Sequence, residues 1–303
     1  MARRAVVIYH DNCNDGFGAA FAFWKWHAPL YGEENVEYVA ASYGNTPPNV
    51  DKDTDVYILD FSYTPEVLVK LAESANYVKL LDHHKTAVEA WKEYDENECK
   101  PVPSNLAVTF DMSHSGAMMA MKYFAPAETY SSLFNYIQDR DLWQFKNPDT
   151  KAFHALLSLQ PKEFSVWDAL MQNIDSPVGS TLIEAGHLLL KQFEKQCEEI
   201  VRIGKRKVWI DGVEGLECNC PPMFASDVGN ILAKESGTFG HTWMDSEDAS
   251  NHSLRSIGDF DVSAVAKKFG GGGHKNAAGF KVGFEDADIC QVFAELVNPV
   301  GPF

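Results

Sequence analysis

Short apolar segments that alternate with helix-like segments constrain the fold of this chain more than any other feature of its sequence. Five segments have the length and composition of buried strands: residues 5–9, 36–40, 56–59, 77–81 and 106–110. Helical patterns lie between or after them, at residues 16–26, 116–124, 130–139 and from Thr64-Pro65-Glu66 onward, where a cap residue precedes proline. Alternation at these lengths is typical of βαβ units. We therefore expect an α/β fold whose first half has a mainly parallel sheet.

The second half of the sequence predicts a long helix followed by a smaller α/β unit. Residues 151–202 are helical in pattern, and this region ends in a long charged segment at residues 180–206. Candidate strands follow at 207–210, 215–218, 239–244 and 277–282, with helices at 226–234, 262–267 and 287–296 and a polar loop at 245–252. We expect three parts: a first domain at residues 1–180, a helical linker at 181–206 and a second domain at 207–303.

Composition is that of a folded protein in a reducing compartment. The 303 residues are 45% hydrophobic, which suits about two domains. No apolar run reaches the roughly 18 residues of a membrane span, and the first apolar segment is too short for a signal peptide. The six cysteines show neither zinc-site spacing nor the density of a disulfide scaffold; they occupy positions 13, 99, 197, 218, 220 and 290. We expect a cytoplasmic protein with no membrane partner.

The strongly acidic balance limits the partners. The formal net charge is -17, from 43 acidic residues against 26 Lys and Arg. A protein that grips a long nucleic-acid backbone usually carries a basic stripe, so a long duplex is not an expected ligand. A short phosphorylated substrate is compatible with this charge if metal ions and a few local cations supply the positive charge.

Acidic and histidine side chains follow several of the expected strands. Asp82-His83-His84 ends the segment at 77–81, Asp60 ends the one at 56–59, and residues 10–15 join the first strand to the first helix. Because parallel strands end at one edge of a sheet, these side chains should meet there, together with Asp139-Arg140-Asp141. Carboxylates and imidazoles suit Mn²⁺ or Mg²⁺, and two such ions would need a bridging carboxylate, for which Asp60 is our candidate. The simpler interpretation is a surface loop that happens to carry histidines.

A glycine-rich segment marks a second candidate site. Four consecutive glycines, which include Gly272 and Gly273, precede His274 and Lys275. Glycine lets backbone N–H groups approach an anion closely, and Arg255 upstream can hold a phosphate in a bidentate fork. The alternative is a flexible turn without a ligand.

These residues together resemble a known family. The chain resembles DHH-family phosphoesterases with the associated C-terminal domain, and the tract at residues 136–143 is most similar to the oligoribonuclease (nanoRNase) and cyclic-nucleotide phosphodiesterase branch. The motifs that carry the resemblance are His10-x-x-Cys13-x-Asp15-Gly16, Asp60, Asp82-His83-His84, and Gly271-Gly272-Gly273-His274 followed by Ala277-Ala278-Gly279. The resemblance implies that residues 1–180 form the metal-binding catalytic domain and residues 207–303 the substrate-binding domain.

The resemblance also implies roles for individual residues. The first metal would be held by His10, Cys13 and Asp60, and the second by Asp15, Asp60, His83 and an acid of the 139–141 tract. We favour Asp139 over Asp141 as that acid. Asp82 would orient His83, and His84 would face the scissile phosphate. Arg255 and His274, with Gly272 and Gly273, would hold the far end of the substrate. Ser115 is expected to begin a helix, and its hydroxyl is also a candidate phosphate contact.

One position departs from the family pattern. Many members have Asp where this chain has Cys13, and a thiol must lose its proton before it binds a metal. The first site would therefore bind its metal weakly, use Asp11 instead, or prefer another metal.

The expected function is a metal-dependent phosphodiesterase that acts on short single-stranded oligonucleotides or small nucleotides through a metal-activated water. The expected cofactor is a pair of Mn²⁺ ions, with Mg²⁺ or Co²⁺ as substitutes, and the expected assembly is a monomer or a homodimer. Two rivals stay open. One is a phosphatase or pyrophosphatase that acts on small phosphate esters, and the other is a nucleotide-binding member without catalytic activity.

Overall fold

The computed structural model describes residues 3–11, 13–97, 102–127, 131–285 and 297–298. The chain divides into two compact units, Met1–Lys191 and Gln192–Phe303, and the division falls inside helix α8 (Gly179–Gly204). We describe each unit by itself. Among the described residues, no helix has both the length and the apolar character needed to cross a membrane.

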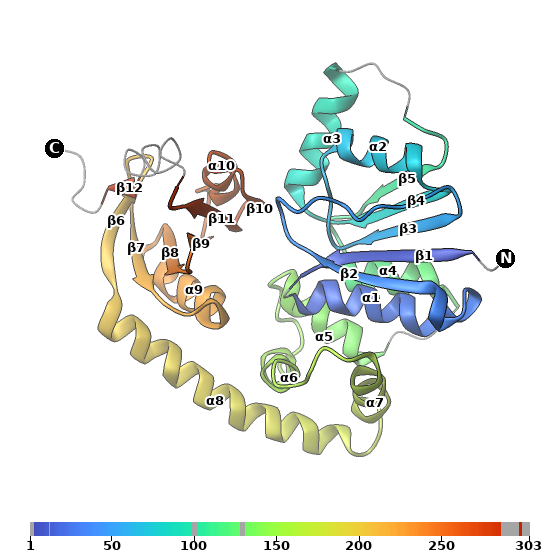
Figure 1. Cartoon of the computed structure of the whole chain (residues 1–303). Coiled ribbons are helices and arrows are strands. Elements are labelled where there is room, and N and C mark those ends of the chain that lie inside the picture. Colours follow the sequence, from blue (N-terminus) through green and yellow to red (C-terminus); the bar gives the residue numbers. More distant parts are fainter. Residues whose placement is uncertain (1–2, 12, 98–101, 128–130, 286–296, 299–303) are drawn as a thin grey trace. The chain divides into compact units, whose positions relative to one another are not determined.

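The first unit is built on a parallel sheet of five strands, as the sequence predicts (Figure 1). Its order is β2-β1-β3-β4-β5, and every neighbouring pair is parallel. From β1 the chain adds β2 on one side of the sheet and then β3, β4 and β5 on the other, so the order of the strands reverses between β1 and β3. Open α/β proteins bind ligands at such a switch point, beyond the carboxyl ends of the strands. The strands are β1 (Arg4–His10), β2 (Val36–Ala41), β3 (Thr54–Leu59), β4 (Tyr77–Asp82) and β5 (Leu106–Phe110).

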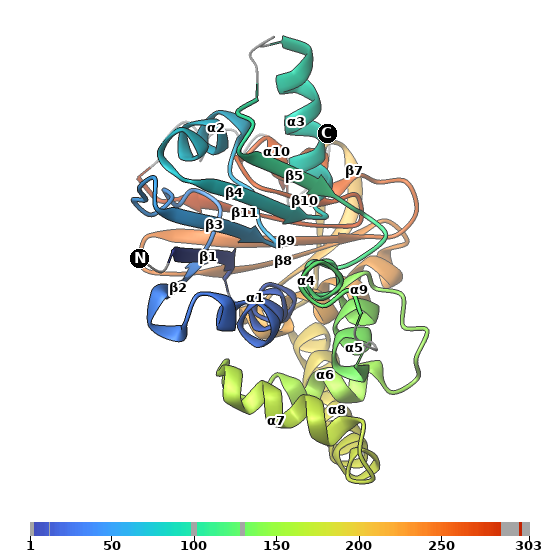
Figure 2. The same ribbon diagram turned by 90° about the vertical axis from the view of Figure 1, so that its right-hand side faces the viewer.

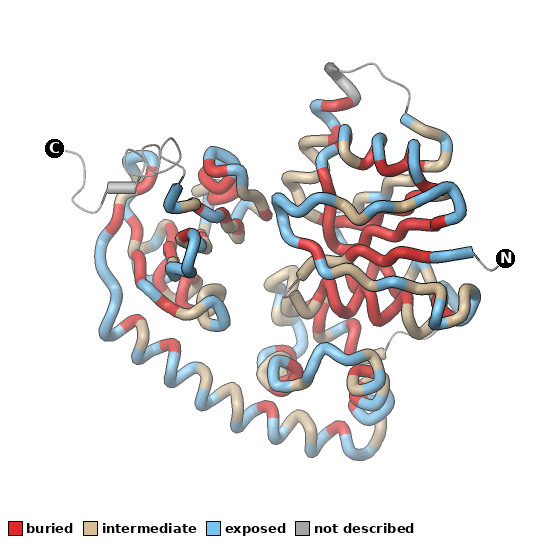
Figure 3. The backbone as a smooth tube through the Cα atoms, in the orientation of Figure 1, coloured by how far each residue is buried: buried red, intermediate tan, exposed pale blue. Residues whose placement is uncertain are grey.

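Helices cover both faces of this sheet because its strands are apolar on both sides. In β1, Ala5 and Val7 pack into one hydrophobic cluster, while Val6 and Ile8 pack into another on the opposite face. Figures 1 and 2 show α1 and α4 below the sheet and α2 and α3 above it, and Figure 3 shows the buried strands between them. The helices of this unit are α1 (Asn14–Trp26), α2 (Pro65–Ser74), α3 (Lys85–Asn97), α4 (Gly116–Phe124), α5 (Ser132–Asp141), α6 (Thr150–Leu157) and α7 (Phe164–Ile174).

The second unit has a mixed sheet of seven strands in the order β10-β11-β9-β8-β7-β6-β12. Strands β7 and β8 run parallel and the other neighbours are antiparallel. This confirms the expected smaller α/β unit. Its elements are β6 (Arg206–Ile210), β7 (Val213–Asn219), α9 (Ala225–Ser236), β8 (Phe239–Asp245), β9 (Ala249–Ser256), α10 (Val262–Lys267), β10 (Gly272–His274), β11 (Ala277–Gly283) and β12 (Val297–Asn298).

The structure corrects one local expectation, adds one helix that was not expected, and does not describe a third segment. The polar loop expected at 245–252 is wrong, because β9 begins at Ala249 and turns Ala249, His252 and Leu254 inward while Asn251 faces solvent. Polar residues on the exposed side of that strand hid its alternation. Helix α3 was not expected, since it buries few apolar side chains among many charged ones. The helix expected at 287–296 lies outside the described residues.

Candidate functional site

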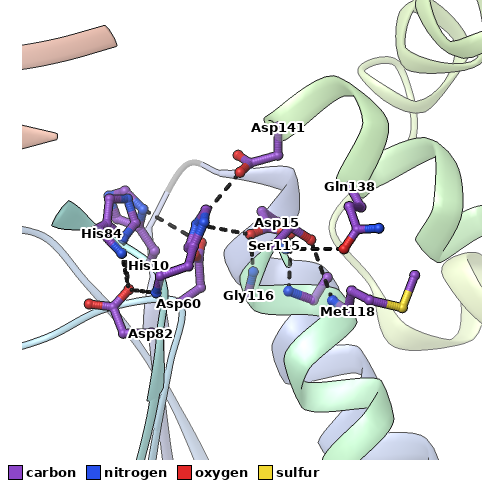
Figure 4. A network of polar contacts seen from close by, with 12 residues as sticks. His10, Asp15, Asp60, Asp82, His84, Ser115, Gly116, Met118, Gln138 and Asp141 are labelled. Atoms are coloured by element: carbon purple, nitrogen blue, oxygen red, sulfur yellow. Dashed lines mark hydrogen bonds and ion pairs between the residues drawn. The ribbon is translucent and has the colours of Figure 1, made fainter. Parts of the chain in front are cut away.

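The carboxyl edge of the parallel sheet gathers most of the acidic and histidine residues that the sequence singled out (Figure 4). His10 and Asp82 are the last residues of β1 and β4, and Asp60 directly follows β3. Strands β1 and β3 are the neighbours that flank the switch point. The topology of the sheet therefore brings His10 to the same edge as Asp60 and Asp82, which lie 50 and 72 positions further along the sequence.

Asp60 lies at the centre of this group. Its carboxylate approaches two imidazoles, with Oδ1 at 3.0 Å from Nε2 of His83 and Oδ2 at 3.7 Å from Nδ1 of His10. The same Nε2 of His83 lies 3.6 Å from Oδ2 of Asp15 and 3.5 Å from Oδ2 of Asp141. Three sets of potential metal ligands in this unit contain Asp60, and within each set one ligand atom per residue lies within 4.8 Å of the others. One set joins Asp60 to Asp82 and His84. The other two, which we call the two ligand sets, are His10 with Cys13 and Asp60, and Asp15 with Asp60 and His83; Asp60 belongs to both.

Asp60 has a special backbone conformation, and glycines pack closely against Asp60 and His10. Asp60 adopts a left-handed conformation with φ of 57°, which aspartate tolerates better than most residues, and its N–H donates to the carbonyl of Leu81. Gly116, the first residue of α4, packs against the carboxylate: a Cβ atom there would lie 2.3 Å from the Cβ of Asp60. Gly16 approaches His10 in the same way, since a Cβ there would lie 2.3 Å from the carbonyl oxygen of His10. Glycine is required at both positions because any side chain would displace a residue of the site.

Asp15 joins the site to the first turn of α4. Its two oxygens accept hydrogen bonds from the backbone N–H groups of Gly116 at 2.6 Å and Ala117 at 3.0 Å. Ser115 is fully buried as the N-cap residue of α4, and its hydroxyl accepts from the N–H of Met118 at 3.4 Å. The expected helix start at Ser115 is therefore confirmed. The hydroxyl caps the helix, and the burial of Ser115 argues against a direct contact with a phosphate.

Asp82 differs from our expectation in the imidazole that it contacts. Oδ1 of Asp82 lies 2.7 Å from Nδ1 of His84, and it accepts from the backbone N–H of His83 at 2.8 Å. We expected Asp82 to orient the ring of His83, but the carboxylate instead fixes the ring of His84. Only His83 and His84 separate β4 from α3, and this short connection brings Nδ1 of His84 to the carboxylate of Asp82.

Asp139 and Asp141, which the sequence left as alternatives, have different environments. Asp139 is buried and accepts from the backbone N–H groups of Lys146 at 2.8 Å and Asn147 at 3.1 Å, and from the hydroxyl of Thr150. Those hydrogen bonds hold the pKa of Asp139 below its ordinary value although burial would raise it. Asp141 points instead toward His83. The structure thus places Asp141, and not the Asp139 that we preferred, beside His83, whereas Asp139 anchors the loop after α5.

The buried charges of the site fit a bound cation. Both oxygens of Asp60 and Oδ2 of Asp141 are buried and accept no hydrogen bond of regular geometry from the described residues. Burial, together with the charges of Asp60 and Asp141, raises the pKa of Asp15 well above its usual range. Burial also raises the pKa of Asp141. Burial would lower the pKa of His83, but the three carboxylates raise it well above its ordinary value. Orphaned carboxylate oxygens and mutually repelling acids are what a divalent cation would satisfy.

Cys13 lies among these acids. Burial and the neighbouring charges of Asp60, Asp141 and Asp15 raise the pKa of its thiol well above the ordinary value. A thiol in such surroundings keeps its proton until a cation displaces it. The ligand set around His10 contains this thiol, so the geometry favours Cys13 over Asp11 as the third ligand of that set.

Sequence reasoning missed two neighbours of the site. Tyr43 lies two residues after β2, at the same sheet edge, and its ring makes edge-on contacts with His10 at 5.8 Å and His84 at 6.5 Å. Its place just beyond a strand end was a usable signal. Lys162, in the loop between α6 and α7, is close enough to Cys13 and Asp11 for their charges to act on its ammonium group, although burial has the larger effect and lowers its pKa. Nothing local in the sequence points to Lys162.

The second candidate site belongs to the second unit and has its own geometry. Arg255 of β9 donates to the hydroxyls of Ser226 at 2.7 Å and Ser253 at 3.1 Å and to the carbonyl of Leu254 at 2.8 Å. Gly272, Gly273 and His274 form β10, paired with β11, where Gly273 has φ of 139°. The last two glycines of the run thus belong to a short strand of a β-hairpin, and the run is not only an open loop.

Comparison with known proteins agrees with the fold and the motifs. The chain is 32% identical over 311 residues to an uncharacterized protein of Acanthamoeba polyphaga mimivirus, covering 94% of this chain and 70% of that protein. It is 25% identical over 321 residues to the oligoribonuclease NrnB of Bacillus subtilis, covering 97% and 77%. A solved structure of an exopolyphosphatase-related protein from Bacteroides fragilis shares the fold, with a TM-score of 0.52 at 13% identity over 97% of this chain and 91% of that one. No model of a protein family matches the chain.

A parallel sheet collects carboxylates and imidazoles at its switch point and is followed by a second sheet unit with a glycine hairpin, and this arrangement is that of DHH-family folds. The chain belongs to the DHH family of phosphoesterases. Enzymes of this family depend on divalent metals, and the acidic sets around Asp60 are of the kind that holds such ions.

Proposed function

We propose that this protein is a metal-dependent phosphodiesterase that hydrolyses short single-stranded oligonucleotides or small nucleotides. The observation that carries the proposal is Asp60, whose buried carboxylate is common to both ligand sets and accepts no regular hydrogen bond from the described residues. His10 and Cys13 would complete one metal site, and Asp15, His83 and Asp141 the other. Mn²⁺ is the expected ion because the sets mix imidazole with carboxylate, and Mg²⁺ or Co²⁺ would substitute.

The residues of the chain have separate tasks in this proposal. A pair of divalent cations that share one carboxylate activates water and neutralises the charge of a phosphoryl displacement. Asp60 is held in place for that task by its left-handed backbone and by Gly116. Two backbone N–H groups in the first turn of α4 donate to Asp15 and orient its carboxylate. The N-terminus of a helix also stabilises a negative charge placed there. The surrounding backbone thus holds the carboxylates of Asp15 and Asp60 in place.

His84 is the residue that we assign to the substrate phosphate. Asp82 accepts from Nδ1 of His84 and so fixes the orientation of the ring. In its doubly protonated form an imidazole donates a hydrogen bond from each nitrogen. His84 would then donate to a phosphate oxygen as negative charge develops on it.

The substrate class rests on charge and on similarity. A chain with net charge -17 repels long polyanions, so only a short substrate that reaches the cations is favoured. The similarity to a protein named oligoribonuclease supports a short oligonucleotide. Arg255, His274 and the glycine pair Gly272 and Gly273 are proposed to hold the far end of that substrate, as donors to its phosphate or terminal group.

The test is a hydrolysis panel over substrate length and metal. Dinucleotides to decanucleotides, a cyclic dinucleotide and a 3′,5′-bisphosphate nucleotide would be assayed with Mn²⁺, Mg²⁺, Co²⁺ and Zn²⁺. Asp60→Ala and His83→Ala are expected to abolish hydrolysis, whereas His187→Ala, an exposed histidine of the same unit, is expected to leave it unchanged. Activity retained in Asp60→Ala would refute the proposal, and turnover of the bisphosphate alone would replace it with a phosphatase.

A further inference from the structure

The loop that follows Asp141 has an unusual backbone. This loop, residues 142–149, joins α5 to α6, and we call it the aromatic loop. Trp143 and Phe145 both adopt left-handed conformations, with φ of 53° and 49°. Bulky residues rarely occupy that region, and they do so where surrounding contacts enforce it, often at functional sites. Two such residues, two positions apart, call for a physical cause.

The cause of this conformation is Asp139. Its carboxylate accepts from the N–H groups of Lys146 and Asn147, and its backbone carbonyl accepts from Gln144 at 2.9 Å and Phe145 at 3.3 Å. These bonds close the aromatic loop back onto the last turn of α5. Core packing is not the reason for the strain, since neither Trp143 nor Phe145 belongs to a hydrophobic cluster formed by the described residues, and both rings are half-buried.

The side chains that this loop presents alternate aromatic rings with cations. The Arg140 guanidinium lies 4.2 Å from the ring centroid of Trp143 and 5.7 Å from that of Phe145. The ammonium of Lys151 lies 5.3 Å from the Phe145 centroid, and the two rings meet edge to face at 5.0 Å. Two cations beside two aromatic rings thus form a locally basic cluster in a chain that has 43 acidic residues. Aromatic rings interleaved with cations are the usual means of stacking nucleobases while neutralising their phosphates.

The grouping lies beside the candidate metal centre. Asp141, which ends α5, approaches His83 at 3.5 Å, and Trp143 follows only two residues later. Two residues of chain span at most about 7 Å, so the Trp143 backbone begins close to the site. At this separation along the chain, the Trp143 ring is within reach of the base next to a phosphate held at Asp60 and His83.

We propose that Trp143, supported by Arg140 and Phe145, is a stacking platform for a nucleobase of the substrate, adjacent to the phosphodiester that is cut. The inference rests on the proposed function and deepens it. It assigns substrate choice to a base contact in the first unit, so that the protein prefers a base-bearing diester over an otherwise identical diester that lacks the base. The strained loop conformation serves to hold the platform rigid, which lowers the entropy lost on binding.

The test pairs changes in the protein with changes in the substrate. A 5′-phosphorylated adenine dinucleotide and its two analogues, each lacking one adenine, would be hydrolysed by wild type, Trp143→Ala, Trp143→Phe and Tyr123→Ala. Tyr123 is the matched control, because it is an exposed aromatic residue of the same unit with a cation, Lys79, 4.9 Å from its ring. Stacking of one base is expected to favour the complete dinucleotide over one analogue by roughly 5- to 150-fold in kcat/KM.

The expected result is that Trp143→Ala loses this discrimination, Trp143→Phe keeps most of it and Tyr123→Ala matches wild type. If Trp143→Ala slows all three substrates by the same factor, the loop merely positions Asp141 and the inference is overturned. If wild type hydrolyses none of the three, the proposed function fails separately. The platform is then tested by the affinities of the same three compounds for wild type and Trp143→Ala, and equal losses for all three would overturn it.

Discussion

Gly116→Ala tests whether activity depends on the close packing of α4 against the carboxylate of Asp60. Gly116 is the first residue of α4, a position where alanine is ordinarily a better helix former than glycine. The added methyl group, however, would lie 2.3 Å from Cβ, 2.7 Å from Cγ and 2.6 Å from Oδ1 of Asp60. The substitution is therefore favourable for the isolated helix and unfavourable for the site.

The size of the effect follows from these distances. Carbon atoms in contact are separated by about 3.5 Å or more, so Asp60 or the start of α4 must move by roughly 1.2 Å. A displacement of about 1 Å in a catalytic group costs on the order of 100-fold in rate. Asp15 accepts from the Gly116 N–H, so a movement of α4 would displace a second ligand. The overpacking itself should cost about 1–3 kcal/mol of stability.

The assay is Mn²⁺-dependent hydrolysis of a dinucleotide, with the melting temperature of the same samples. Gly186→Ala is the matched control: it places a methyl group 2.3 Å from the carbonyl oxygen of Ala152, in packing between α8 and α6 that carries none of the site residues. We expect both variants to lose stability, and only Gly116→Ala to lose activity per folded molecule. A Gly116→Ala enzyme with wild-type kcat/KM would show that Asp60 does not need this position.

Further predictions concern individual ionisable groups. Asp141→Asn should abolish turnover and raise the melting temperature of the metal-free protein, because burial raises the pKa of this carboxyl and its ionised form opposes folding. Asp139→Asn should instead lower stability by about 1–3 kcal/mol in urea unfolding, since it weakens three buried hydrogen bonds; the reverse pattern would restore Asp139 as the ligand. In Mn²⁺ titrations from about pH 7 to 9, affinity should rise more steeply for wild type than for Cys13→Asp, because burial and Asp60 raise the thiol pKa and ligation requires its loss; parallel curves would exclude Cys13 as a ligand. In the second unit, burial would raise the pKa of Glu217, but His241, which it contacts at 3.0 Å, and Arg206 hold it below the ordinary value. The stability that Glu217 contributes relative to Glu217→Gln should therefore be complete above the unfolded pKa of about 4.3 and disappear as pH falls through the lowered folded value; a difference that persists at lower pH would contradict this sign.

Much of the candidate site could be predicted from the sequence because the ends of buried strands can be recognised in it. His10, Asp60 and Asp82 each close an apolar run, and parallel strands must present such ends at one edge. The same logic predicts Asp15, which lies in the first turn of the helix after β1. These placements needed only periodicity and topology.

The failures concern side-chain direction. Asp139 and Asp141 lie two positions apart on one helix and so face nearly opposite sides; which side meets His83 depends on how α5 packs. The partner of Asp82 depends on the backbone path of the two residues between β4 and α3, which no residue pattern specifies. Trp143 and Phe145 show no sequence sign of their left-handed backbone, because it is imposed by hydrogen bonds to Asp139.

The most direct test of the account is the number of Mn²⁺ ions that the purified chain binds, measured by calorimetric titration of wild type and Asp60→Asn. A carboxylate shared by both ligand sets predicts two ions per chain in wild type and the loss of both sites together in Asp60→Asn. Two ions retained at wild-type affinity in Asp60→Asn, or none bound by wild type, would contradict the claim that Asp60 is the bridge of a two-metal centre.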